Sequence, residues 1–192
     1  MKRYIRAIIL MLALLTLLPG AHPAQAADEI TPVSALTDLR ANAPEGTFLE
    51  AGAAPIITDD SYQSEHINIK ITKSRLEEHK TDIAVAEIYV SSVQYLRRAF
   101  ALDKWKGDMR SVKTIAGDSK AILAMTGDYA SLLDAGLVVA NGTLYRKSEN
   151  RVRDNCLILA DGRMATYKRR EMDLNAVLET GGIWHSFLFG PQ

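Results

Sequence analysis

The chain has 192 residues with 23 basic and 23 acidic side chains, so its formal net charge at pH 7 is zero. This balance argues against a nucleic-acid partner held by counterion release. Cys156 is the only cysteine, which excludes an intrachain disulfide, and its apolar neighbours favour a buried structural thiol over a nucleophile.

Residues 1–26 have the three-part pattern of a secretory signal peptide. A basic start at residues 2–6 precedes an apolar run at residues 7–18, and Ala24-Gln25-Ala26 is a pattern that signal peptidase accepts. The apolar run is shorter than the roughly 20 residues of a spanning helix. We therefore expect cleavage after Ala26, no stable membrane span afterwards, and a secreted or cell-envelope location. An uncleaved membrane anchor is the alternative. Cleavage would leave 166 residues, enough for one ordinary core.

The first part of the remaining chain differs in composition from the rest. Residues 27–62 are rich in Ala, Pro, Thr, Asp and Gly, and they are expected to form an N-terminal extension with one short helix around residues 33–41. Residues 63–192 are expected to belong to the folded domain. Alternation at residues 66–72 predicts a half-buried strand, and the more apolar residues 82–91 predict a more central strand.

The middle of the chain gives weaker signals. Residues 94–102, which include the pair Arg97-Arg98, fit either a continued strand or a helical turn. The spacing of apolar residues over 109–119 predicts a short helix that ends near Gly117. The apolar run at residues 121–126 predicts a compact buried strand.

Two hairpins, one helix and one strand are predicted in the last third. Asn141-Gly142 and Asp161-Gly162 each separate two apolar, β-prone runs, and such dipeptides favour tight turns in which both residues have positive φ. Residues 169–180 have an amphipathic helical pattern, and residues 183–189 are aromatic and β-prone. The expected fold class is α+β, with a mixed, mainly antiparallel sheet, β-hairpins and a few short helices.

One polar segment stands out as a candidate site. Gly127-Asp128-Tyr129 follows the apolar run, a position where rigid structure often presents functional groups. Asp128 can coordinate a metal, orient a sugar hydroxyl or act in acid-base chemistry, and Tyr129 can stack on a sugar ring. The alternative is a tight turn in which Asp128 caps the backbone. The four histidines do not cluster, so no zinc site and no cofactor are evident, and a divalent metal is left open.

Four segments, in their order along the chain, resemble motifs of the phosphodiester glycosidase family. Residues 124–130 (AMTGDYA) are similar to its Ala-Ile-Asn-Gly-Asp-aromatic motif, and residues 136–145 to its Gly-x-x-x-x-Asn-Gly segment. Residues 156–162 are similar to its Leu-x-Ile-x-x-Asp-Gly hairpin. Its Ser-Phe-Gly-Pro-like strand corresponds to Phe187, Phe189, Gly190 and Pro191. The resemblance covers about residues 67–192.

The resemblance implies hydrolysis of a sugar-1-phosphodiester to a free sugar and a phosphomonoester, linked in bacterial relatives to exopolysaccharide or envelope glycans. It makes Asp128 the candidate catalytic residue, and it implies that Thr126, Gly127, Tyr129 and Gly190 bind substrate. The partner implied is a glycan or sugar-phosphodiester.

Two departures from the family pattern qualify this expectation. The family has Asn where this chain has Thr126, and a hydroxyl cannot offer both the donor and the acceptor of an amide. The family's later Asn-Pro-Arg and Asp-Gly-Gly-Gly-Ser motifs do not occur in the sequence. We therefore expect an incomplete domain that is inactive alone and needs a completing C-terminal segment or a second chain. The alternative is a non-catalytic envelope module that binds a glycan or a protein.

Overall fold

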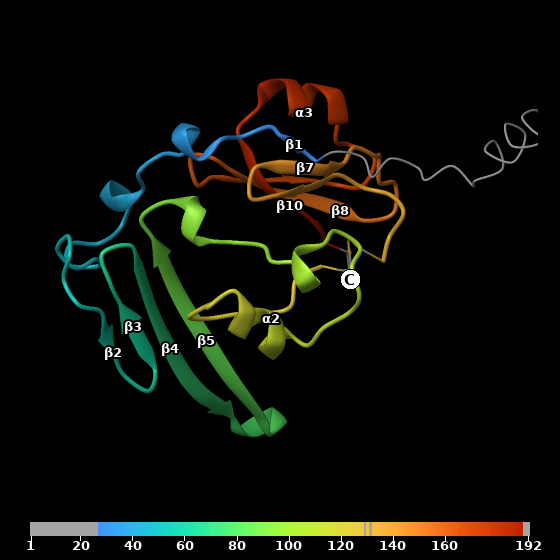
Figure 1. Ribbon diagram of the computed structural model, residues 1–192. Coiled ribbons are helices and arrows are strands. Elements are labelled where there is room, and N and C mark those ends of the chain that lie inside the picture. The colour runs from blue at the N-terminus through green and yellow to red at the C-terminus, as the bar shows by residue number, and fades with distance from the viewer. Residues whose placement is uncertain (1–26, 129, 131, 190–192) are drawn as a thin grey trace, which may run out of the picture.

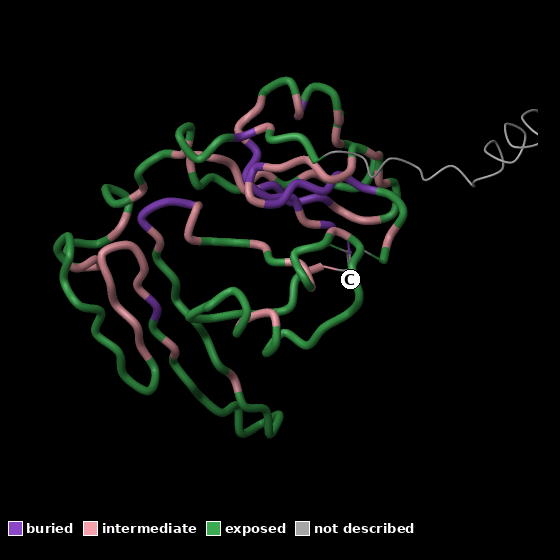
Figure 2. Tube along the Cα trace, viewed as in Figure 1, coloured by how far each residue is buried: buried purple, intermediate pink, exposed green. Residues whose placement is uncertain are grey.

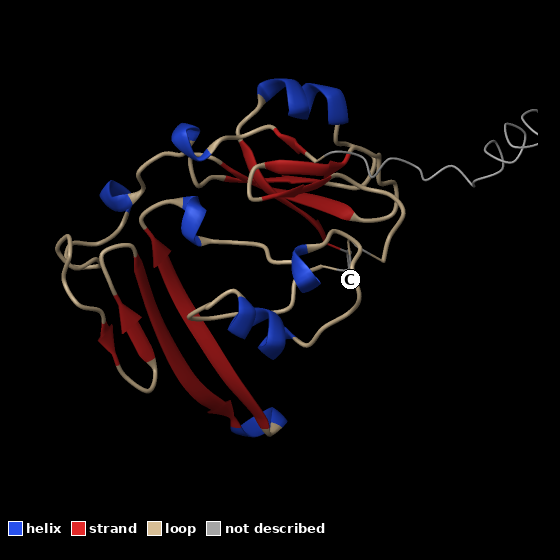
Figure 3. Cartoon of the chain, in the orientation of Figure 1, coloured by secondary structure: helices blue, strands red, loops and turns tan. Residues whose placement is uncertain are grey.

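The computed structural model describes residues 27–128, 130 and 132–189. Within these residues, ten strands form three antiparallel sheets, accompanied by two α-helices and five short 3-10 helices. The expected α+β class with a mainly antiparallel sheet is therefore confirmed. Figures 1 and 3 show two groups of strands, with the chain between β5 (Thr81–Val90) and β6 (Val138–Ala140) running from one group to the other.

Two of the sheets lie together in one body, with one helix over them (Figure 1). The first sheet has the strand order β1 (Asp28–Glu29), β7 (Thr143–Arg146), β6 (Val138–Ala140). The second has the order β10 (Ile183–Phe189), β8 (Asp154–Leu159), β9 (Met164–Tyr167). The helix is α3 (Leu174–Thr180), which begins after Asp173, whose carboxylate accepts hydrogen bonds from the amides of Asn175 and Ala176.

The main core lies between these strands and α3. Its fully or nearly buried members are Leu137, Val139, Leu157, Val177 and Ile183. They come from β8, β10, α3 and the start of the β6–β7 hairpin, so the apolar faces that the sequence predicted for these segments do meet. Figure 2 shows most of the buried residues in this body. Cys156 is buried, as expected, and burial raises the pKa of its thiol.

The third sheet projects from this body and is much more exposed. Its strand order is β2 (Ile56–Ile57), β3 (Ser61–Gln63), β4 (Ile67–Leu76), β5 (Thr81–Val90). Register places Ile57, Tyr62, Ile69 and Ile88 in one row across the sheet, yet Ile57 is 71% exposed and Ile88 is 47% exposed. Strand β4 confirms the first predicted strand. The expectation that residues 82–91 are more central is wrong, because β5 is the last strand of its sheet and most of it is exposed.

The remaining short helices lie in the connections. They are η1 (Val33–Ala35), η2 (Arg40–Asn42), η3 (Glu77–His79), η4 (Val93–Tyr95), η5 (Ala101–Asp103) and α2 (Val112–Asp118). Helix α2 confirms the helix predicted at residues 109–119. Two 3-10 turns joined by extended chain occupy residues 93–103, where strand and helical turn were both open. Strand β1 pairs with β7, so part of the N-terminal segment belongs to the first sheet.

The buried strand predicted at residues 121–126 is not formed. These residues are irregular and exposed, and the side chain of Met125 is 85% exposed. An apolar run becomes a buried strand only when another strand satisfies its backbone groups. Within the described residues no strand pairs with this run.

Candidate functional site

Asp128 lies at the end of this irregular segment, with its side chain turned into the protein. The side chain is only 3% exposed. Oδ1 forms an ion pair with Nη2 of Arg98, and Oδ2 accepts a hydrogen bond from the backbone amide of Leu188 at 2.6 Å. Both carboxylate oxygens therefore have protein partners.

Arg98 joins Asp128 to the last strand. Its Nη1 donates to the carbonyl of Ser186 at 2.8 Å, and its guanidinium lies 5.4 Å from the ring centroid of Phe187. Burial lowers the pKa of the Arg98 guanidinium, and the Asp128 carboxylate opposes this shift. The side chain of Arg98 is 12% exposed, so this ion pair is shielded from solvent screening.

The ion pair occupies the free edge of β10. Strand β10 is an outer strand of its sheet, and its other edge pairs with β8. The carbonyl of Ser186 and the amide of Leu188, two residues apart, bind Arg98 and Asp128 respectively. An unpaired strand edge leaves backbone amides and carbonyls without hydrogen-bond partners. Here the side chains of Arg98 and Asp128 form the hydrogen bonds that a neighbouring strand would otherwise form.

Asn141 fastens the β6–β7 turn to the same network. Its Oδ1 accepts from the backbone amide of Arg98 at 3.0 Å, and its Nδ2 donates to the Arg98 carbonyl at 2.8 Å. The backbone amide of Asn141 donates to Nδ1 of His185 at 3.2 Å. One amide side chain thus holds both backbone groups of Arg98.

Trp184 and His185 complete the network through a β-bulge. The register of β10 against β8 shifts between Ile183 and His185. Consequently two consecutive side chains reach the same acceptor: Nε1 of Trp184 and Nε2 of His185 both donate to the Leu96 carbonyl, at 3.1 and 2.7 Å. His185 is fully buried, which lowers its pKa to about 4.

Arg146 shapes the loop that follows Asp128. Its guanidinium donates to the carbonyls of Gly136 at 2.8 Å and Ala135 at 2.7 Å, and also to those of Ala130 and Leu133. It lies 5.7 Å from the ring centroid of Trp105. Arg146 therefore ties the loop from residue 130 to 136 to β7.

The structure separates the predicted site residues by burial. Thr126 and Gly127 are exposed, whereas the side chain of Asp128 is buried. Tyr129 and Gly190 lie outside the described residues. Arg98, Asn141 and His185 were not predicted from the sequence as site residues. The pair Arg97-Arg98 was a visible signal, but nothing local indicates which arginine is buried.

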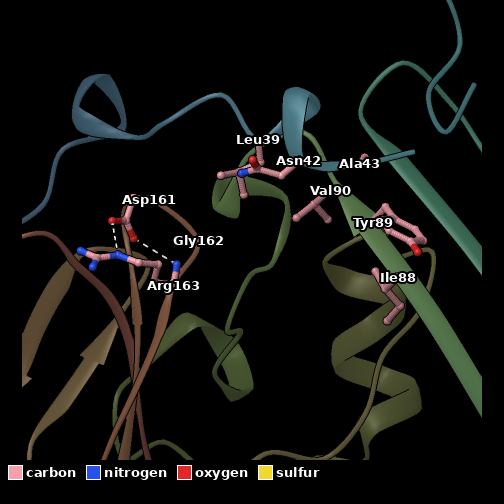
Figure 4. A pocket seen from close by; sticks show the side chains of 9 residues that line it. All are labelled: Leu39, Asn42, Ala43, Ile88, Tyr89, Val90, Asp161, Gly162 and Arg163. Atoms are coloured by element: carbon pink, nitrogen blue, oxygen red, sulfur yellow. Dashed lines mark hydrogen bonds and ion pairs between the residues drawn. The ribbon is translucent and has the colours of Figure 1, made fainter. Parts of the chain in front are cut away.

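Two surface clefts lie elsewhere. The first, of about 320 Å³, is shown in Figure 4. There Asp161 and Arg163 bond to each other on one wall, and Ile88 and Tyr89 lie on the other. The second, of about 450 Å³, lies between the loop before β8 and the loop before α3. Thr126, Gly127 and Asp128 line neither cleft. The described residues hold no group of three or more His, Cys, Asp or Glu side chains arranged to bind a metal ion.

Comparison with known proteins adds no family assignment: no family model, curated protein or solved structure matches this chain. Within the described ranges, no helix is long and apolar enough to cross a membrane. Fold and site thus define an α+β protein whose buried Arg98–Asp128 pair joins an irregular loop to the edge of a sheet.

Proposed function

We propose that this chain is a phosphodiester glycosidase-like protein of the cell envelope, which hydrolyses a sugar-1-phosphodiester to a free sugar and a phosphomonoester. One observation supports the proposal most. Three of the four segments that carry the family resemblance contribute atoms to one bonded network: Asp128, Asn141 and Leu188 all bind Arg98 or its partner.

The chemistry asks for two kinds of stabilisation. Water adds to the anomeric carbon, the bond from that carbon to the phosphate oxygen breaks, and the leaving phosphate keeps the electron pair. Positive charge develops on the sugar and negative charge on the leaving group, so a carboxylate and a guanidinium held in fixed positions suit the reaction. Asp128 and Arg98 are such groups in this proposal, and Thr126 and Gly127 border the solvent side.

A specific observation favours a second candidate, a non-catalytic envelope module that binds a glycan or a protein. Asp128 is buried and both of its oxygens are engaged, so the carboxylate is not presented to a ligand in this conformation. A catalytic role requires that the loop around residues 126–128 exposes the carboxylate when substrate binds.

The test is release of N-acetylglucosamine and UDP from UDP-N-acetylglucosamine by the full chain, with or without a completing segment, followed by proton and phosphorus NMR. We expect Asp128→Asn to lower the rate per folded molecule by about a hundredfold. The same change leaves Arg98 unpaired and should cost about 3 kcal/mol of stability. Folded fraction must therefore be measured by near-ultraviolet circular dichroism for every rate.

Asp161→Asn is the matched control, because Asp161 also pairs with an arginine but lies on an exposed turn. Its rate should equal that of the native protein. If the native chain is folded and releases no sugar in any arrangement, the hydrolase proposal fails and the binding module is favoured. An unchanged rate for Asp128→Asn would remove Asp128 from the site.

A further inference from the structure

The second cleft is unlike the Arg98–Asp128 network in being open to solvent and bordered by arginines from two separate loops. Its lining comprises Glu149, Asn150, Arg151, Arg170, Met172 and Leu174, and its volume is about 450 Å³. Pockets for small molecules range from about 300 to 1,000 Å³, so the cleft has room for a sugar-sized ligand rather than a bare ion only.

The two loops that form the cleft are strongly basic within a neutral chain. Residues 147–153 and 168–173 together carry six basic and three acidic side chains, whereas the whole chain has zero net charge. Lys168 is paired with Asp154, just outside these segments. Concentrated positive charge at a concave surface raises the local concentration of anions.

The loop that presents Arg151 is pre-organised. Oδ1 of Asn150 accepts from the amides of Val152 at 3.0 Å and Arg153 at 3.3 Å, and its Nδ2 donates to the Arg153 carbonyl at 3.1 Å. The guanidinium of Arg151 bonds to Glu149 through Nη2 at 3.1 Å. These hydrogen bonds within the loop hold Arg151 at the cleft.

Arg170 comes from the opposite loop in a strained conformation. Its φ is 69°, in the left-handed region that is costly for a residue with a side chain. It forms no ion pair with any side chain in the part of the chain that the structure describes. The guanidinium of Arg170 is therefore available to an anionic ligand at the cleft.

Two apolar side chains also line the cleft. Met172 and Leu174 are partly buried and pack against the main core. An apolar wall beside charged donors suits a sugar ring that carries an anionic group. With Glu149 the charged side chains of the lining sum to +1, and the guanidinium groups of Arg151 and Arg170 offer N–H donors to the three oxygens of a phosphomonoester.

From these observations we propose that the cleft between residues 149–151 and 170–174 is a binding site for a phosphorylated saccharide. Arg151 and Arg170 hold the phosphate, and Met172 and Leu174 contact the sugar ring. Glu149 accepts hydrogen bonds from sugar hydroxyls. The site is separate from Asp128, and the inference does not depend on hydrolysis by this chain.

The experiment is an NMR titration of the ¹⁵N-labelled full chain with α-D-glucose 1-phosphate. Parallel titrations use inorganic phosphate, D-glucuronate and D-glucose. Binding of glucose 1-phosphate should saturate below about 10 mM, with shifts at the amides of residues 149–151 and 170–174. It should be tighter than binding of the other three compounds and should weaken with added salt.

The variant that tests the site is Arg170→Asn, because asparagine tolerates the left-handed backbone and removes the charge. It should weaken binding by about tenfold. Arg163→Gln is the control, since it removes an arginine that is also exposed and that pairs with Asp161 outside the cleft. It should change the affinity by less than about twofold.

Three outcomes would overturn the proposal. The first is the absence of saturable binding by the native chain. The second is equal weakening by Arg170→Asn and Arg163→Gln, which would mean attraction by net charge alone. The third is D-glucuronate or inorganic phosphate binding as tightly as glucose 1-phosphate.

Discussion

The two hydrogen bonds of the His185 ring require that the ring is neutral in the folded protein. Nδ1 accepts a hydrogen bond from the amide of Asn141, and Nε2 donates one to the carbonyl of Leu96. A protonated ring would have a donor at Nδ1 facing another donor. Burial is the main cause that lowers the pKa of His185 to about 4; the nearby charge of Arg98 lowers it further, and the Leu96 carbonyl opposes the shift.

This histidine should make stability depend on pH. In the unfolded chain its pKa is 6.5, so between pH 6.5 and about 4 the unfolded state binds a proton that the folded state does not. The contribution of His185 is fully present above pH 6.5 and falls by about 3 kcal/mol as the pH approaches 4. Urea unfolding at pH values from about 4 to 7 measures it.

The comparison that isolates His185 is between His185→Gln and His79→Gln. The first should flatten the dependence of unfolding free energy on pH over this range, even if it lowers stability everywhere. The second removes an exposed histidine and should leave the slope unchanged. Equal slopes in native protein and His185→Gln would contradict the assignment.

At the scale of secondary-structure elements, the β6–β7 turn bonds to several other segments. Asn141 and Gly142 have φ of 51° and 75°, so both adopt the positive φ that the dipeptide predicted. The Gly142 carbonyl accepts from the amides of Ile30 and Thr31 at 2.8 and 3.0 Å, and its amide donates to the Trp184 carbonyl at 2.9 Å. The turn therefore joins β1, its own hairpin and β10.

Substitution of Gly142 should be far more harmful than substitution of a glycine with the same backbone conformation in open space. A Cβ at Gly142 would lie 2.1 Å from the carbonyl oxygen of Thr31, whereas a Cβ at Gly46, also with φ of 75°, meets nothing within 4 Å. We expect Gly46→Ala to cost about 1 kcal/mol from φ alone, and Gly142→Ala to cost at least about 3 kcal/mol.

Denaturant unfolding of the two alanine variants gives both free energies under identical conditions. The difference between the two losses of unfolding free energy measures the cost of the clash with Thr31, because both variants carry the cost of an alanine at positive φ. Similar losses in the two variants would mean that β1 moves away from the turn at little cost.

The sequence predicted the elements that depend on local signals and missed those that depend on distant partners. The Asn141-Gly142 turn was predicted correctly, whereas at Asp161-Gly162 only the glycine has positive φ and residues 160–163 form a longer loop. The helix expected from residue 169 begins at Leu174, after its Asp173 cap. Two Asx-Gly pairs look alike in sequence, and the flanking strand register decides their geometry.

The partners of the candidate site residue Asp128 could not be predicted from the sequence, because they are distant along the chain. Asp128 was selected from its position after an apolar run, but its partners Arg98 and Leu188 are 30 and 60 residues away along the chain. No periodic pattern connects such positions. The strand predicted at residues 121–126 failed for a related reason, since its apolar character did not reveal whether another strand would pair with it.

At the scale of the whole molecule, burial is unevenly distributed. The main core belongs to the body formed by the first two sheets and α3, while most residues of β4 and β5 are exposed (Figure 2). Strand length is therefore a poor guide to local stability here. The two longest strands, of ten residues each, lie in the least buried sheet.

Amide hydrogen exchange should reveal this division. We expect the amides of β8 and β10 to exchange only through global unfolding. Amides along β4 and β5 away from Ile69 should exchange through local opening that has a lower free energy. Exchange measured by NMR at increasing low concentrations of urea separates the two classes. Equal opening free energies in both sheets would show that the exposed sheet unfolds together with the core.

The Arg98–Asp128 pair also bears on the order in which the protein folds. The groups it holds on β10 are 88 residues from Arg98 and 60 residues from Asp128, and β10 is the last of the described strands to leave the ribosome. Contacts between distant parts of a chain form slowly, because the loop between them must first be closed. During synthesis, the charged side chains of Arg98 and Asp128 would thus stay in solvent until β10 has emerged, so closure of this sheet edge is a late step in the folding of the described residues.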